Sequence, residues 1–458
     1  MARKIIPFSA VLAMNGYEVK KETSSGDLVT ICPWCKNDTL WVKDEKNTGH
    51  CWSCARTSNP ITFHMQACGI SEYKQALLDA KKKLESGEYS EIIAHESESA
   101  KTSYVSPIMI RNKTYVTLFK YLGLSEDHKK NLEGRGMNHT FLYRTLDFKA
   151  LNESELIENL LKDGCKLQGV APFYYENGKW HIKKYPRGIL VPYMDSNSMI
   201  QGLQLRIDDD LLKPYTGKDG KTHTPSKYVW LSSGDKENGT RGESYGSYLC
   251  NYVNYNNMRV ATFRNGICTI TEGAMKGDIA HQLSGKSFWA LAGVNAQGKR
   301  FEKELKNLKS LGVSTIEIAF DMDRFLNISV LAAIKKMCET VKANGFKLRI
   351  LSWNTEYALF NGDHRQLEMF KDFVFTPESY KRAVSKERLD YVVSAVKDFG
   401  ISNIFFAFAN KDEAINNQDL FNEFKKKYGK DIQITPIIWK LRLKGIDNYY
   451  AYEVKHIL

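Results

Sequence analysis

The sequence predicts an α/β protein with three successive parts. The first part holds two Cys-x-x-Cys pairs, Cys32–Cys35 and Cys51–Cys54, which indicate a small metal-stabilised fold. The second part, residues 106–260, reads as helices followed by strands. The third part, residues 261–458, alternates strands and helices, as chains with a mostly parallel sheet do.

The composition fits a folded protein of several domains. Its 458 residues suffice for two to four domains of about 100–200 residues. Hydrophobic residues make up 43% of the chain, which excludes wholesale disorder. No apolar run approaches the ~18 residues of a membrane span, so we expect a cytoplasmic protein without membrane contact. The net charge of +12 is compatible with a polyanionic partner, although solvated surface lysines would give the same balance.

The cysteine spacing predicts a zinc site. Two intervening residues let both thiolates of a knuckle hold one ion at about 2.3 Å, and two knuckles complete a tetrahedron. In a reducing cytosol, such clustered cysteines act as thiolate ligands and do not form disulfides. We therefore predict that Zn²⁺ is held by the four clustered cysteines, which are Cys32, Cys35, Cys51 and Cys54.

Short strands with a turn at residues 44–47 are predicted between and beside the knuckles. His50 is interpreted as a bystander, although it is also a possible zinc ligand or phosphate contact. Trp41 and Trp52 either stack on nucleic-acid bases or cover the ribbon's own core, and both interpretations remain open. An amphipathic helix over residues 70–87 and a polar linker follow, which predict a tethered ribbon able to swing.

In the second part, three strands are predicted at residues 187–196, 199–208 and 226–233. Arg206 ends one of these strands, and Lys227 and Tyr228 precede the apolar part of another. A basic side chain at a strand end beside a cleft is a natural phosphate ligand, whereas the alternative is a solvated strand end.

Acidic residues in the third part follow two predicted strands. Glu272 comes directly after a buried strand, and Asp321 and Asp323 follow another. Functional groups of parallel sheets gather at the carboxyl ends of strands, so the three carboxylates are expected to lie together. Crowded carboxylates need a cation, and hard oxygen ligands suit Mg²⁺ or Mn²⁺. The alternative is a set of solvated loop acids.

These motifs carry a family resemblance. Glu272-Gly273 and Asp321-x-Asp323 resemble the Toprim domain of bacterial-type primases, topoisomerases and some nucleases and recombination proteins. The four-cysteine ribbon resembles that of phage primases, and residues 187–233 resemble the N-terminal subdomain of the primase core. Because the three resemblances occur in the primase order, the chain is identified as similar to zinc-ribbon/Toprim DNA primases of a phage or mobile-element branch.

The resemblance implies an organisation and an activity. The implied parts are a template-binding ribbon (1–85), a linker (86–105), a primase-core subdomain (106–260) and a Toprim catalytic domain (261–458) with an insertion at about 354–437. The implied enzyme is a nucleotidyltransferase that makes short RNA primers from NTPs on single-stranded DNA. The chain has no complete P-loop motif, so the replicative helicase is expected to be a separate protein.

The resemblance also implies residue roles. Asp321 and Asp323 would hold Mg²⁺ or Mn²⁺, and Glu272 would act as a second metal ligand or as a base. Arg206, Lys227 and Tyr228 would bind nucleotide or nucleic acid. A Toprim nuclease and a catalytically inactive nucleic-acid-binding accessory protein are the alternative functions.

The sequence departs from the usual primase pattern in two places. Lys276 stands four residues after Glu272, where primases commonly have an aspartate, and Asp278 two residues further is a possible replacement ligand. Lys276 is a further candidate phosphate contact. The segment Leu443–Asp447 resembles one that closes some phage Toprim domains, which makes Asp447 another candidate acid.

The inserted stretch echoes the acidic segment. Residues 313–331 parallel residues 401–420, with Ala409 in place of Asp321 and Lys411 in place of Asp323. We interpret the stretch as a degenerate second βαβ unit that has lost its metal ligands and extends the sheet or forms a lid. The alternative is coincidence, since any β-α-β segment has this rhythm.

Overall fold

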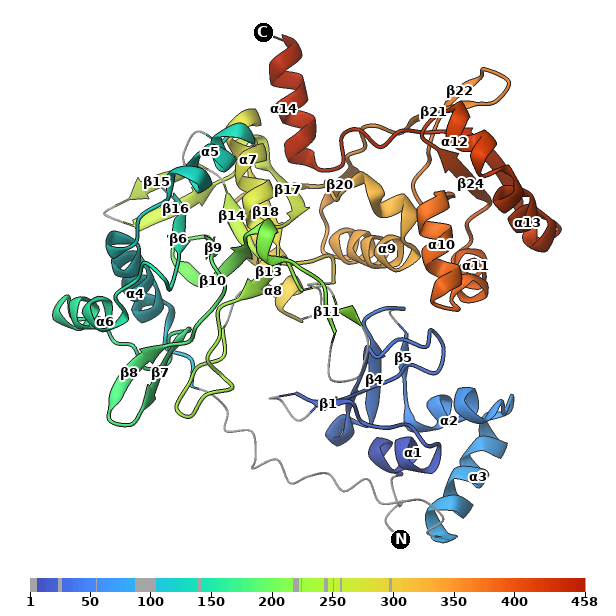
Figure 1. Cartoon of the computed structure of the whole chain (residues 1–458), viewed down its shortest axis with the longest axis horizontal. Helices are drawn as coiled ribbons and strands as arrows, with labels where there is room; N and C mark the ends of the chain where they lie inside the picture. Colours follow the sequence, from blue (N-terminus) through green and yellow to red (C-terminus); the bar gives the residue numbers. More distant parts are fainter. Residues whose placement is uncertain are drawn as a thin grey trace. The chain divides into compact units, whose positions relative to one another are not determined.

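The computed structural model of the chain (Figure 1) describes residues 6–23, 27–54, 56–86, 104–137, 142–216, 222–223, 225–242, 246–249, 251–255, 258–295 and 299–457. These residues form two compact units. The first unit comprises Met1–Thr102, Phe325–Ala333 and Glu356–Lys440, and the second comprises Ser103–Arg324, Ile334–Thr355 and Leu441–Leu458. Most of the predicted linker, residues 87–103, lies outside the described residues.

The N-terminal ribbon of the first unit is an antiparallel sheet in the order β1-β2-β3-β4-β5 with three helices. The predicted turn is a short 3-10 segment, Asp44–Lys46, that ends at Asn47 in a left-handed conformation (φ 51°). The predicted helix after the ribbon is also present. The bounds are α1 (Phe8–Met14), β1 (Lys21–Glu22), β2 (Leu28–Thr30), β3 (Leu40–Lys43), β4 (Thr48–Cys51), β5 (Thr57–Ser58), α2 (Pro60–Cys68) and α3 (Tyr73–Ser86).

The second unit begins with a mixed helix and strand region, whose main sheet is antiparallel in the order β13-β10-β9-β6. The three predicted strands are present as β9, β10 and β13, whereas the β7–β8 hairpin was not predicted. The bounds are α4 (Ile108–Tyr121), α5 (Glu126–Gly134), β6 (Arg144–Leu146), α6 (Glu153–Lys162), β7 (Phe173–Glu176), β8 (Lys179–Ile182), β9 (Gly188–Met194), β10 (Ile200–Ile207), β11 (Tyr215–Thr216), β12 (Thr222–His223) and β13 (Tyr228–Trp230).

Both faces of β9 are buried, which explains its continuous apolar sequence. Successive side chains of a strand point to opposite faces. Leu190 accordingly joins the core that contains α4 and α6, while Ile189, Val191 and Tyr193 join a separate core with the start of α7 (Ala274–Ser284). This second core fixes the position of the chain that follows Glu272.

The α/β part of the second unit has a sheet in the order β14-β18-β17-β19-β20. β18, β17, β19 and β20 are parallel, and β14 is an antiparallel edge strand, so the predicted mostly parallel sheet is confirmed. The bounds are β14 (Ser247–Leu249), β15 (Asn251–Tyr255), β16 (Met258–Thr262), β17 (Ile267–Glu272), α7 (Ala274–Ser284), β18 (Phe288–Leu291), α8 (Lys299–Ser310), β19 (Thr315–Ile318), α9 (Ile328–Ala343), β20 (Lys347–Ile350) and α14 (Ile446–Ile457).

Glu356–Lys440, which we call the inserted domain, forms a second sheet in the order β22-β21-β25-β24-β23. β23, β24 and β25 are parallel, so the predicted second βαβ unit is present, and Lys411 begins the helix after β24. The unit has its own sheet, so the expectation that it extends the first sheet is wrong, and its role as a lid stays a prediction. The bounds are β21 (Glu356–Leu359), β22 (His364–Gln366), β23 (Asp372–Phe375), α10 (Pro377–Ser385), α11 (Leu389–Asp398), β24 (Asn403–Phe408), α12 (Lys411–Asn416), α13 (Gln418–Tyr428) and β25 (Gln433–Ile438).

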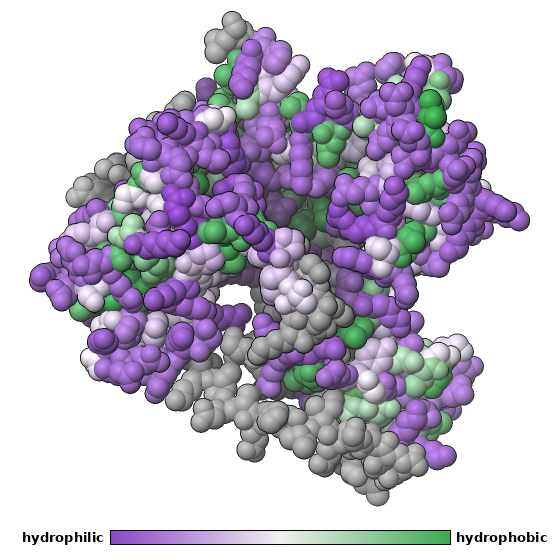
Figure 2. All heavy atoms as spheres, viewed as in Figure 1, coloured by the Kyte–Doolittle hydropathy of each residue, from purple (hydrophilic) through white to green (hydrophobic). Residues whose placement is uncertain are grey.

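The surface is mostly hydrophilic on the face that Figure 2 shows, with apolar side chains in small scattered patches. Within the described part of the chain, none of the helices combines the length and the apolar character needed to cross a membrane.

Candidate functional site

The four clustered cysteines converge on one point. Their sulfur atoms all lie within 4.8 Å of one another, with 3.7 Å between Cys32 and Cys54 and 3.6 Å between Cys35 and Cys51. A tetrahedral Zn²⁺ with bonds of about 2.3 Å requires sulfur separations of roughly 3.8 Å, so the residues fit the metal. Hydrogen bonds among the four sulfurs lower the pKa of Cys51 and Cys54 and leave the pKa of Cys32 and Cys35 raised, so metal binding would release protons from the cluster.

The sequence around the cysteines builds the two knuckles. Lys36 adopts a left-handed conformation (φ 58°), and its amide donates to the Cys32 carbonyl at 2.9 Å, which closes the first knuckle. Cys51 ends β4 opposite Leu40 of β3. Asn37 and Thr39 both donate to Ser53 Oγ, at 2.6 and 2.8 Å, and tie the second knuckle to the first.

The aromatic residues of the ribbon form one group. The rings of Trp41 and Trp52 lie 6.0 Å apart, and His50 packs against Trp52 at 4.7 Å. Trp52 is 44% exposed. His50 lies outside the cysteine group, as expected for a bystander. Trp52 packs against both other rings and is partly exposed, so its stacking on bases stays a prediction.

A second group of possible metal ligands consists of His64, Cys68 and Asp79. His64 Nε2 already bonds to Asp79 at 2.8 Å. The ammonium of Lys83 lies 3.0 Å from the same carboxylate and 3.9 Å from the Cys68 sulfur. Lys83 therefore supplies the positive charge at this group, and the contacts join α2 to α3.

The predicted acidic edge lies at the carboxyl ends of two neighbouring strands. Glu272 is the last residue of β17, and Asp321 follows β19, which pairs with β17 in parallel. Gly273, at φ 85°, makes the turn into α7, a conformation that favours glycine. Burial raises the pKa of the Glu272 carboxyl, Lys276 opposes this shift, and Asp321 and Asp323 raise the pKa further.

Two lysines lie against the aspartates. Lys276 Nζ is 2.5 Å from Asp321 Oδ1, and Lys444 Nζ is 2.7 Å from Asp323 Oδ2 and 4.0 Å from Asp321 Oδ2. Burial opposes the charged form of Lys444, but the bond to Asp323 and the nearby carboxylates leave its pKa raised. The ammonium of Lys444 therefore bridges the two aspartates that were predicted to share a metal ion.

The chemistry of these acids suits Mg²⁺, which prefers carboxylate oxygens. Their arrangement differs from that of the cysteines, because Glu272, Asp321 and Asp323 do not bring three ligand atoms within 4.8 Å among the described residues. The donor set thus fits a hard cation whose binding requires the ammonium groups or the carboxylates to shift.

The segment after the inserted domain returns to this edge. The Met322 amide donates to the Lys444 carbonyl at 2.8 Å, and Trp353 Nε1 donates to the Leu443 carbonyl at 2.8 Å. These bonds hold Lys444 beside the aspartates. Sequence reasoning named only Asp447 in this segment. Lys444 belongs to the same motif, so it could also have been named as a candidate.

Asp447 and Asp321 meet at Gly445. A Cβ on residue 445 would lie 2.3 Å from Asp447 Oδ1 and 3.4 Å from Asp321 Oδ1. Asp447 is buried, and its other oxygen accepts from Arg135 Nη2 at 3.1 Å. The structure thus brings the candidate Asp447 to the acidic edge, together with Arg135, which sequence reasoning missed.

Replacing Gly445 by alanine is expected to destabilise the second unit by about 1–3 kcal/mol, as overpacking of a filled site does. The new methyl group would overlap the Asp447 carboxylate, which is buried and paired. Denaturant unfolding monitored by fluorescence measures the effect. Gly293→Ala is the matched control, because a Cβ there meets no atom within 4 Å. Equal stability of the two variants would contradict the close packing at Gly445.

Asp278 takes part in different contacts. Its Oδ2 accepts from Tyr143 at 2.6 Å, and its Oδ1 accepts from Gln282 at 3.2 Å. It is buried on α7. These contacts join α7 to the neighbouring core, so the geometry gives Asp278 a packing role, and its role as a metal ligand stays a prediction.

The predicted phosphate ligands share one acid. Arg206 Nη2 lies 3.0 Å from Asp209, and Lys227 Nζ lies 2.7 Å from the same carboxylate. Tyr228 is the cross-strand partner of Arg206. Arg206 is buried, and its Nε has no hydrogen-bond partner among the described residues. A buried donor without a partner is costly, which fits a residue that binds a ligand.

Tyr193 links this sheet to the acidic edge. Its hydroxyl accepts from the Ala274 amide at 3.2 Å and donates to Gln204 at 3.1 Å. Sequence reasoning did not single out Tyr193, which stands in the continuous apolar sequence of β9. The bond holds the first turn of α7, and with it Lys276, against the sheet that contains β9 and β10.

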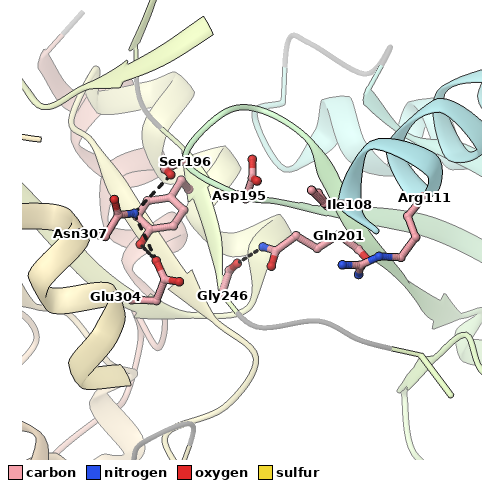
Figure 3. A pocket seen from close by; sticks show the side chains of 9 residues that line it. Ile108, Arg111, Asp195, Ser196, Gln201, Gly246, Glu304 and Asn307 are labelled. Carbon is pink, nitrogen blue, oxygen red and sulfur yellow. Dashed lines mark hydrogen bonds between the residues drawn. The ribbon is translucent and has the colours of Figure 1, made fainter. Parts of the chain in front are cut away.

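A separate cavity of about 170 Å³ lies within the second unit (Figure 3). Its polar side chains largely bond to one another. Tyr248 donates to Glu304 at 2.6 Å, and Asn307 donates to Ser196 at 3.2 Å. None of the predicted acids lines this cavity, so it is distinct from the acidic edge.

Comparison with known proteins gives one curated relative. A DNA primase of Mycoplasma genitalium is 22% identical over 438 residues, which cover 88% of this chain and 64% of that protein. The chain resembles a bacterial DNA primase. It spans about two thirds of the relative's length, and no family model matches it. The resemblance read from the ribbon and the acids is therefore confirmed at the level of DNA primases, while the phage branch stays a prediction.

Solved primase structures give weaker matches. The Aquifex aeolicus primase, with its zinc-binding and RNA polymerase domains, is 15% identical, with 93% of this chain and 95% of that chain covered at a TM-score of 0.35. The RNA polymerase domain of the Mycobacterium tuberculosis primase is 14% identical, with 54% and 76% covered at a TM-score of 0.37.

Proposed function

We propose that the chain is a DNA primase that makes short RNA primers from NTPs on a single-stranded DNA template. The observation that carries this proposal is the cluster of Glu272, Asp321 and Asp323 at the carboxyl edge of two parallel strands. The four-cysteine ribbon and the similarity to a curated primase support the same function. A separate replicative helicase is part of the proposal.

The proposed reaction is a nucleotidyl transfer, in which a 3′-hydroxyl loses its proton and attacks the α-phosphate of an NTP, the bond to the β-phosphate breaks, and pyrophosphate leaves. Mg²⁺ or Mn²⁺ held by Asp321 and Asp323 would neutralise the charge that develops on the phosphate. Glu272 would serve as a further ligand or as a base, and its raised pKa suits proton transfer. Asp447 adds a fourth carboxylate to this edge. The four carboxylates would attract a cation once Lys276 and Lys444 move away.

Basic residues would bind the nucleotide and the template. Lys276 and Lys444 already lie against the aspartates and can turn to the triphosphate when metal enters. Arg206, with its unpartnered Nε, and Lys227 would contact phosphates from the neighbouring sheet. Tyr228 and the exposed Trp52 offer aromatic faces for bases.

Incubation with single-stranded DNA, Mg²⁺ and labelled NTPs tests the function. Short labelled oligomers support a primase. Shortened DNA without labelled oligomers would instead identify a nuclease that uses the same acids. Binding of DNA without turnover would identify a catalytically inactive accessory protein.

Replacing Lys444 by glutamine is expected to tighten Mn²⁺ binding about tenfold, because the ammonium that bridges Asp321 and Asp323 no longer competes with the metal. Titration of Mn²⁺ by electron paramagnetic resonance, without nucleotide, measures this affinity. Lys440→Gln removes an exposed charge earlier in the same segment and is the matched control. If both variants bind Mn²⁺ with the wild-type affinity, Lys444 does not occupy the metal position.

A further inference from the structure

The zinc ribbon and the inserted domain belong to the same compact unit, and their contacts gather at the second zinc knuckle. Tyr391, on α11 of the inserted domain, packs half-buried against the apolar core of the ribbon. Burial, the charge of Cys54 and a hydrogen bond to the Cys54 sulfur raise the pKa of the Tyr391 hydroxyl. A zinc-ligating thiolate therefore has its outer hydrogen bond from a residue more than three hundred positions away in the sequence.

Two polar contacts flank Tyr391. Ser329 Oγ donates to the Ser53 carbonyl, and Arg56 lies 3.9 Å from Asp398. Ser329 is in the first turn of α9, whose Ile328 and Leu331 share the apolar core of the inserted domain. The ion pair is exposed and contributes little by itself. Together the contacts involve Cys54, the last of the four cysteines, and its neighbours Ser53 and Arg56.

The helix α11 contacts the core of the inserted domain with one face and the ribbon with another. Leu389, Val393 and Val396 lie on one face and are buried in the core of the inserted domain. Tyr391 and Asp398 are seven residues apart, so they share another face, and both contact the ribbon. The side chains that reach the ribbon are thus separate from those that hold the helix in its own domain.

The parallel strands β23, β24 and β25 of the inserted domain repeat the arrangement of β17, β19 and β20, but two of the acids at the strand ends are missing. β24 is followed by Ala409 and Lys411, where the equivalent strand β19 is followed by Asp321 and Asp323. The equivalent edge therefore lacks metal ligands at these two positions. The side chains of this domain that contact the ribbon, Tyr391 and Asp398, lie instead on α11.

We propose that the inserted domain is a docking site for the second zinc knuckle, and that docking depends on bound zinc through the bond from Tyr391 to the Cys54 thiolate. A docked ribbon presents Trp52 from a fixed position, in contrast to the freely swinging ribbon that the sequence predicted. Loss of zinc removes the thiolate arrangement that Tyr391 recognises and releases α11.

Hydrogen exchange and zinc release test this proposal on the full-length protein. Removal of zinc by a chelator is expected to speed exchange in residues 389–398 severalfold, because α11 loses its cover. Tyr391→Phe keeps the ring and removes the hydroxyl. It is expected to weaken zinc binding about tenfold, as loss of an outer-shell bond does, measured by transfer of zinc to a chromophoric chelator.

Tyr380→Phe is the matched control, because Tyr380 lies in the aromatic core of the inserted domain against Phe375 and Phe424. The proposal is overturned if the hydrogen-exchange rate of α11 is unchanged by zinc removal. It is also overturned if Tyr391→Phe binds zinc as tightly as Tyr380→Phe does. These readouts involve no primer synthesis, so docking stands or fails independently of the proposed function.

Discussion

Primer synthesis by Asp321→Ala is expected to fall at least about 100-fold below the wild-type rate, as it does when a group that stabilises transition-state charge is removed. Asp321 occupies the centre of the acidic edge. It contacts Lys276 at 2.5 Å, lies 4.0 Å from Lys444, and shares with Asp447 the space above Gly445. Its loss removes a proposed metal ligand and leaves Lys276 without this partner.

The measurement is the rate of labelled-NTP incorporation on single-stranded DNA at saturating Mg²⁺. Asp321→Asn retains the shape of the side chain and is expected to be nearly as impaired, which separates charge from packing. Asp412→Asn is the control, because Asp412 is an exposed acid in the first turn after β24, the equivalent strand of the inserted domain. Synthesis by Asp321→Ala at the wild-type rate would show that the metal assignment is wrong.

The second large effect is expected for Cys51→Ser. Structural zinc contributes about 10–16 kcal/mol to the folding of small zinc domains, and the Cys51 sulfur lies in the centre of the ribbon core. We expect the variant to lose zinc and its ribbon to unfold. Initiation on single-stranded DNA should fall at least tenfold, while binding of free NTPs to the second unit changes little.

Zinc content, hydrogen exchange in residues 28–58 and initiation rate together measure this effect. Cys68→Ser is the control, because Cys68 is exposed and lies outside the four-cysteine group. If Cys51→Ser initiates primers as well as Cys68→Ser does, then the ribbon does not read the template.

The parts of the site that the sequence could predict are those coded locally. The spacing of Cys32, Cys35, Cys51 and Cys54 is sufficient because two tight knuckles leave one geometry for a tetrahedral ion. Glu272 and Asp321 could be placed because both follow apolar strands, and the carboxyl ends of parallel strands meet at one edge. The same rule predicted the second βαβ unit of the inserted domain, since the apolar pattern of β24 repeats that of β19.

The remaining features depend on contacts between distant segments. Arg135 and Asp447 are 312 residues apart, and their pairing follows only from the packing of the second unit. Lys444 reaches Asp323 because Met322 and Trp353 bind the returning segment. The contact of Tyr391 with Cys54 joins two domains whose sequences carry no mutual signal. Periodicity describes one element at a time, so it could not predict these pairs.

The most direct test of the central claim is to sequence the products that the wild-type protein forms from NTPs and Mg²⁺ on a single-stranded DNA of defined sequence. The acidic edge and the ribbon predict short RNA oligomers that are complementary to the template and start at a preferred template position. RNA products that ignore the template sequence, or shortened template without RNA products, would contradict the assignment of this chain as a primase.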